Sequence, residues 1–133
     1  MKIVAIICRI LLGLMFVVFG LNGFLHFIPM GPMPPADSLP GHFFAAFAGS
    51  GWMKVVAALQ VLGGLLVLIG GTLPFGLILL CPITFNILCF HILLTGGSGI
   101  GAGLAATVLE LVLIYAYRAN FAGILTTKAT PTL

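Results

Sequence analysis

The side chains best suited to binding a small molecule are two histidines and two asparagines in an otherwise apolar chain. His26 follows Asn22 by about one helical turn, and His91 follows Asn86 in a later apolar run. We expect these residues to lie on helices that cross a membrane. Depth, counted at about 1.5 Å per residue from the ends of those helices, places both imidazoles in the outer half of the membrane. Histidines at similar depth on neighbouring helices ligate a haem or another tetrapyrrole, or hydrogen-bond a quinone carbonyl. These four residues are therefore the candidate cofactor-binding set.

A structural role for the same side chains is the competing interpretation. Each histidine can bond to a backbone carbonyl or to water near the membrane surface, and His26 can also bond to Asn22. Asn86 and His91 are separated by about 140° around a regular helix. We therefore expect them to face different neighbours, unless a kink at Pro82 reorients them.

Arg9 and Glu110 form a second candidate pair, in the inner half of the membrane. A charge at the bilayer centre costs about 3 kcal/mol, so an ion pair between the first and last helices would offset two such costs together. A buried ion pair that closes the helix bundle is therefore predicted. The alternative is a path for protons or substrate through Glu110.

The composition excludes most soluble classes of protein. The 133 residues are 62% hydrophobic and 5% charged, whereas a soluble domain carries about 25% charge. The net charge of +3 comes from a few scattered side chains, too sparse for a nucleic-acid surface. The three cysteines form no CxxC pair, which argues against a thiol-disulfide enzyme. We expect an integral membrane protein that contacts the lipid bilayer and has no nucleic-acid partner and no metal site.

Four apolar segments are long enough to cross a hydrocarbon core of about 30 Å, which takes about 20 residues. We predict an all-α membrane protein, a single domain of residues 1–133 folded as an antiparallel bundle of four transmembrane helices. A Pro-rich loop and a short interfacial helix near residues 42–48 are expected between the first two spans, and residues 126–133 form a polar tail. The predicted spans are residues 3–28, 52–69, 73–94 and 100–118.

Proline and glycine add detail to these helices. Pro82 removes the hydrogen bond to the carbonyl of Ile78 and crowds the preceding turn, so a kink that needs neighbouring helices is expected. Glycines on one stripe of the first helix, such as Gly13 and Gly20, predict the close approach of another helix. The Gly-rich residues 96–103 lack the lysine of a phosphate-binding loop and indicate a flexible turn.

The basic residues indicate how the helices are oriented. Four spans put both termini and the turn after Ile69 on one side, which carries all the Lys and Arg residues except Lys54. Because cytoplasmic segments are enriched in Lys and Arg, both termini are predicted to be cytoplasmic. The Pro-rich loop and the Gly-rich turn are then expected to face outward.

Several sequence stretches occur together in an order typical of a known membrane family. They are RILLGL at 9–14, FGLNGFLHF at 19–27, PMGPMPP at 29–35, PITFN to FH at 82–91 and LEL to AYR at 109–118. In these stretches, over about residues 7–125, the chain resembles the DoxX family of small bacterial four-helix membrane proteins. The resemblance implies a location in the bacterial inner (plasma) membrane. The family often has a glutamate before the glycines of the second helix, where this chain has Gln60, which argues against a proton-carrying role for that helix.

The resemblance implies an association with redox chemistry but no particular reaction. The family's namesakes are membrane subunits associated with quinone-linked oxidation of sulfur compounds, and other members are tied to membrane redox complexes or oxidative-stress responses. The sequence has no catalytic constellation, and its small-residue faces and outer loop are suited to packing. These features predict an auxiliary, non-catalytic subunit of a larger inner-membrane complex that handles electrons or quinones, with other membrane subunits as partners. The alternative is a small redox protein that binds haem, another tetrapyrrole or quinone through His26 and His91.

Overall fold

The computed structural model describes residues 1–132, and all regular secondary structure in this part of the chain is helical. A π-helical turn, η1, directly continues the fourth α-helix. The elements are α1 (Lys2–Leu25), α2 (Leu39–Gly49), α3 (Trp52–Ile69), α4 (Leu73–Cys89), η1 (Phe90–Leu94), α5 (Gly101–Ala116) and α6 (Arg118–Phe121).

Three of the described helical segments are long and apolar enough to cross a membrane. They are α1, α3 and the continuous segment Leu73–Leu94 formed by α4 and η1. The prediction of an all-helical fold is confirmed, and three helices are suited to crossing a membrane, whereas the bundle of four spans stays a prediction. α5 is also apolar but has only 16 residues. It ends before the predicted residue 118 because the chain turns at Tyr117 and begins again as α6.

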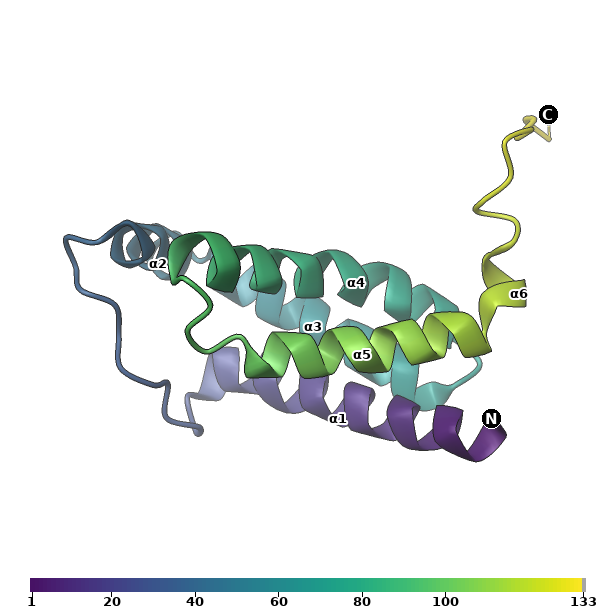
Figure 1. Ribbon diagram of the computed structural model, residues 1–133, viewed down its shortest axis with the longest axis horizontal. Helices are drawn as coiled ribbons and strands as arrows, with labels where there is room; N and C mark the ends of the chain where they lie inside the picture. The colour runs from purple at the N-terminus through teal and green to yellow at the C-terminus, as the bar shows by residue number, and fades with distance from the viewer. Residues whose placement is uncertain (133) are drawn as a thin grey trace.

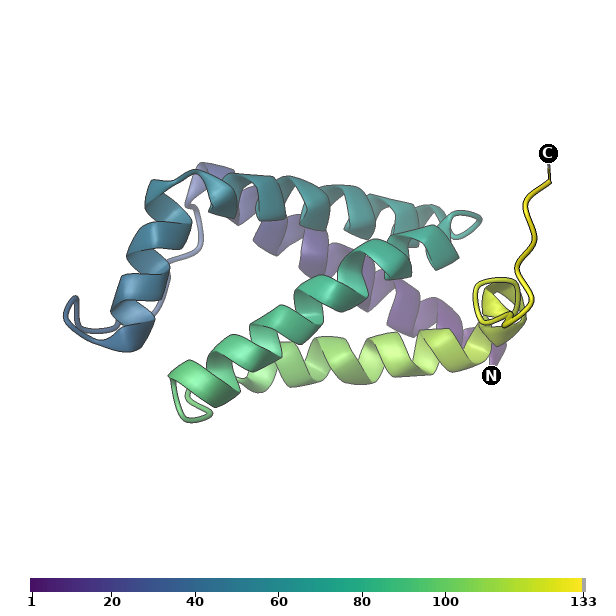
Figure 2. The ribbon, with the colours of Figure 1, turned by 90° about the horizontal axis from the view of Figure 1, so that it is seen from above.

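The four long helices contact one another in a ring. α1 packs against α3 and α5, and α4 packs against the same two helices. The N-terminus and α6 lie at one end of the long axis, and the loop between α1 and α2 lies at the other (Figure 1). Figure 2 shows that α3 and α4 are close at their short connecting turn and spread apart toward the loop end, where α2 lies across the wider space.

Glycines allow α1, α3 and α4 to approach at backbone distance. A Cβ atom added to Gly64 of α3 would lie 2.8 Å from the carbonyl oxygen of Gly13 in α1. On the other side of α3, a Cβ atom added to Gly76 of α4 would lie 2.8 Å from the carbonyl oxygen of Gly63. Any side chain at these positions would push the helices apart. The close approach predicted from the glycine stripe of the first helix is confirmed at Gly13.

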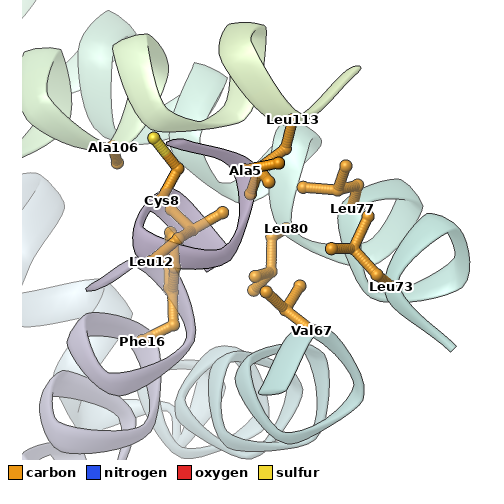
Figure 3. Close-up of a cluster of buried hydrophobic side chains, with 10 residues drawn as sticks. All are labelled: Ala5, Cys8, Leu12, Phe16, Val67, Leu73, Leu77, Leu80, Ala106 and Leu113. Carbon is orange, nitrogen blue, oxygen red and sulfur yellow. The ribbon is translucent and has the colours of Figure 1, made fainter. Parts of the chain in front are cut away.

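The hydrophobic core lies in the half of the molecule nearer the termini. Leu12 of α1, Leu80 of α4 and Leu113 of α5 are each 0% exposed. Figure 3 shows these leucines together with Val67 of α3 and the smaller Cys8. All four long helices contribute to this cluster. It therefore holds together the ends of the helices that lie nearer the chain termini.

The outward faces of the long helices are apolar. Large side chains that point away from the core include Ile3, 74% exposed, Phe85, 66% exposed, and Leu93, 74% exposed. In water such surface is unfavourable by about 25 cal/mol per Å², whereas hydrocarbon solvates it without this cost. The exposed apolar faces are therefore suited to contact with a lipid bilayer.

Candidate functional site

A cavity of about 520 Å³ lies in the half of the molecule nearer the loop between α1 and α2. It begins where the core ends, since Phe16 and Ala106 belong to both. Its walls come from the last turns of α1, the first half of α3, the region of η1 and the first turns of α5. The volume falls within the range of small-molecule sites, about 300–1,000 Å³. His26, His91 and Asn22, three of the four candidate cofactor-binding residues, line it.

His91 is held in place by the turn that follows η1. Its Nδ1 lies 2.6 Å from the carbonyl oxygen of Ser98, and the Thr95 hydroxyl lies 2.9 Å from the carbonyl oxygens of both His91 and Ser98. The ring packs against Gly99, which has a φ of 75° and no side chain to obstruct it. Since a carbonyl oxygen only accepts hydrogen bonds, Nδ1 carries the proton of the neutral imidazole. Nε2 is therefore the atom able to accept a hydrogen bond from a ligand or to bind a metal.

The end of α1 forms another wall of the cavity. The Asn22 side chain donates to the carbonyl oxygen of Ile28 at 3.2 Å and accepts from the Ile28 N–H at 2.6 Å. These two bonds fold the chain back onto the helix, which explains why α1 ends at Leu25 and not at the predicted residue 28. They also fix the orientation of the Asn22 amide in the wall of the cavity and leave its second N–H, together with the His26 side chain, able to meet a ligand.

His26 has an unusual backbone conformation. Its φ of 52° is the only positive φ among the non-glycine residues of the described chain. His26 is the C-cap of α1, and helices commonly end with a left-handed residue, which costs about 1 kcal/mol or more where that residue is not glycine. The conformation gives His26 its place at the rim of the cavity, where the side chain is exposed.

Gln60 is a lining residue that sequence analysis did not include in the site. It lies on α3 and is partly buried. The remaining walls are mostly apolar, with Phe16, Phe19 and Met53 among them. One signal in the sequence points to Gln60: its side chain is the only polar one in residues 55–71. A lone amide in an apolar helix tends to face a protein interior or a cavity, because hydrocarbon offers it no partner.

Aromatic side chains join α2 to the region of His91. The ring centroids of Phe43 and Phe90 are 5.3 Å apart, and those of Phe90 and His91 are 5.2 Å apart. Phe47 stacks on Phe43 at 5.8 Å and itself lines the cavity. α2 covers residues 42–48, where a short helix was expected, and it closes one side of the site. Its location in the membrane interface stays a prediction.

Asn86 does not belong to the cavity, which corrects its place in the predicted cofactor-binding set. It is exposed, and its Nδ2 donates to the carbonyl oxygen of Pro82 at 2.8 Å. α4 continues through Pro82 as a helix, so the separation of about 140° between Asn86 and His91 is not removed. The two side chains accordingly bond to different neighbours.

The ion pair predicted between Arg9 and Glu110 is not formed. The carboxylate Oε1 of Glu110 accepts a hydrogen bond of 2.7 Å from the hydroxyl of Thr84, with both residues buried. The Nε of Arg9 is buried without a hydrogen-bond partner, and its guanidinium lies beside Gly70 at the turn between α3 and α4. Similar depth therefore did not bring the two side chains together, because they face different neighbours around their helices.

Comparison of the chain with models of protein families, with curated proteins and with solved structures gives no match in any of the three. The resemblance to the DoxX family therefore stays a prediction.

Proposed function

We propose that α1, α3, the segment of α4 and η1, and α5 cross the membrane as an antiparallel four-helix bundle, and that the cavity near the Pro-rich loop binds a quinone or quinol. The observation that carries this proposal is the convergence of His26, His91 and Gln60 on one mostly apolar cavity of about 520 Å³. Sites for amphipathic small molecules combine apolar walls with a few polar groups that fix orientation. A quinol has a flat apolar ring and polar oxygens at its two ends.

The arrangement of His91 favours a quinol over a charged tetrapyrrole. The unprotonated Nε2 can accept a hydrogen bond from a ring hydroxyl, while Gln60 or His26 donates to the oxygen at the far end of the ring. A haem carries two carboxylates, yet none of the described residues that line the cavity is Lys or Arg. An uncharged ligand avoids the cost of placing such charges among apolar walls.

A role within a larger redox assembly of the inner membrane remains part of the proposal, but its motivation changes. The glycines of α1 and α3 are used in contacts within the chain, so they are not free to pack against partner subunits. We propose that a subunit role follows from carrying the quinone, with other membrane subunits supplying the electron-transfer centres. The DoxX-like motifs, which include the segment around His26, support this role as a subunit of a redox assembly.

Replacing His91 with leucine is expected to weaken binding of a short-tailed quinol to the purified protein about tenfold, because one ligand hydrogen bond is lost. Gln60→Leu is expected to have a similar effect. His42→Leu is the matched control, since His42 is an exposed histidine of α2 outside the cavity. Binding is measured by fluorescence titration, together with the quinone extracted per mole of protein from native membranes.

Two results would contradict this assignment. Equal affinity in the wild type, His91→Leu and Gln60→Leu proteins would exclude the cavity as the quinol site. A visible absorption band of a tetrapyrrole that disappears in His91→Leu but persists in His42→Leu would assign the cavity to a pigment.

The proposed topology predicts the outcome of reporter fusions. Fusions after Leu125 are expected to report a cytoplasmic location, and fusions within residues 34–41 an external one, because Lys54 is the only basic residue expected outside. Alkaline phosphatase and green fluorescent protein fusions measure the two locations in the same cells. An external C-terminus would invert the orientation and place the cavity on the cytoplasmic side.

A further inference from the structure

A second cavity, of about 590 Å³, lies at the opposite end of the molecule, between the first turns of α1 and the last turns of α5. Lys2, Arg9 and Arg118 line it, which are three of the five Lys and Arg residues in the chain. No acidic residue is among the described residues that line it. Glu110, the only acidic residue of α5, is bonded to Thr84 instead. The cavity is therefore positively charged, and no acidic side chain among its described lining residues neutralises this charge.

Arg9 is the least exposed member of this set: it is partly buried, whereas Lys2 and Arg118 are exposed. Its Nε has no hydrogen-bond partner, and its guanidinium fits beside Gly70, where a Cβ atom would collide with it. Leaving a charged donor buried and unpaired is costly, so native proteins rarely do so unless a ligand supplies the partner. Arg9 also lines the cavity, so an anionic oxygen there can pair with the charge of its guanidinium.

Arg118 lies at the rim, in a fixed position. Its Nη1 donates to the carbonyl oxygen of Tyr115 at 2.9 Å, and its guanidinium carbon lies 4.6 Å from the centroid of the Tyr115 ring. These contacts use one N–H and one face of the guanidinium, and leave its other N–H groups for a ligand. Tyr117, which also lines the cavity, carries a further hydroxyl donor.

We propose that this cavity binds an anionic phosphate group, with Arg9 at its base and Lys2 and Arg118 at its rim. Guanidinium groups bind phosphate oxygens through paired hydrogen bonds, and an ammonium adds a point charge. At this end of the helices the source is an anionic phospholipid headgroup or a soluble phosphate compound, and both present the same chemistry. The site is independent of the quinol cavity, which lies at the other end of the helices.

Native mass spectrometry of the detergent-purified protein tests this site. Phosphatidylglycerol and phosphatidylcholine with identical acyl chains are added in turn, and the wild type is expected to retain phosphatidylglycerol preferentially. Arg118→Gln and Lys2→Gln are each expected to lower its affinity about fivefold, since each removes one basic contact. Both residues are exposed, so the fold should persist, and circular dichroism verifies that it does.

Lys128→Gln is the matched control, because it removes the same charge from an exposed residue that does not line the cavity. An equal loss of affinity in Lys128→Gln and Arg118→Gln would overturn the proposal, as would equal retention of the two lipids together with no binding of inorganic phosphate. Binding of inorganic phosphate that is weakened by Arg118→Gln but not by Lys128→Gln would support the site and assign it to a soluble ligand.

Discussion

Replacing Gly64 with alanine is expected to lower the free energy of unfolding by about 1–3 kcal/mol, the usual cost of overpacking a close contact. The added Cβ would lie 2.8 Å from the carbonyl oxygen of Gly13 and 3.0 Å from the backbone nitrogen of Val17. Both are backbone atoms, so the contact can be relieved only by moving α1 away from α3. A larger residue, as in Gly64→Leu, is expected to prevent the two helices from packing.

Gly101→Ala is the control for this change. Gly101 begins α5, and a Cβ atom there would meet nothing within 4 Å. Its replacement is expected to leave stability unchanged or to raise it by up to about 1 kcal/mol through helix propensity. Unfolding in mixed micelles with increasing denaturing detergent gives the free energies of unfolding of the wild type, Gly64→Ala and Gly101→Ala. Equal stability of Gly64→Ala and the wild type would mean that α1 and α3 are farther apart than the structure describes.

A double-mutant cycle is expected to couple Glu110 to Thr84 and not to Arg9. The hydrogen bond between Thr84 and Glu110 is buried, so removing one partner leaves the other unsatisfied at a cost of about 1–3 kcal/mol. The variants Thr84→Val and Glu110→Leu, singly and together, should therefore give a coupling energy of about that size. Unfolding free energies in the same micelles measure it.

The comparison cycle pairs Glu110→Leu with Arg9→Met. The two residues do not bond to each other, so their effects are expected to add to within about 0.5 kcal/mol. A coupling energy between Arg9 and Glu110 that exceeds about 0.5 kcal/mol, together with no coupling between Thr84 and Glu110, would restore the ion pair that the sequence predicts. Folding of each variant is verified by its helical circular dichroism.

Position along a helix could be predicted from the sequence, whereas the partner that a side chain meets on another helix could not. Counting residues from the helix ends groups His26 with His91, and both line one cavity. The same counting paired Arg9 with Glu110, but Glu110 faces Thr84 across α4 and α5. Thr84 gave no signal of its own, because a threonine can satisfy its hydroxyl within its own helix and is common in apolar helices.

The cavity itself also could not be predicted from the sequence. Its volume depends on where the helices separate, and that depends on which glycines meet. Gly63 and Gly64 are adjacent in the sequence but contact different helices, α4 and α1 respectively. A stripe of glycines indicates that some helix comes close, yet it does not say which one or where the pair diverges. In the sequence, Gln60 accordingly stands out as a departure from a family pattern and not as a lining residue.

The length of α5 has a consequence for the surrounding lipid. With 16 residues α5 is about 24 Å long, whereas α1 with 24 residues is about 36 Å long. A hydrocarbon core is about 30 Å thick, so a crossing α5 is too short for it while α1 is long enough to tilt. With α5 crossing as proposed, this hydrophobic mismatch would draw the two leaflets together beside α5, whereas tilting of α1 needs no change in thickness. The protein would then sit at a local gradient of membrane thickness, and it would be enriched where the bilayer is already thin.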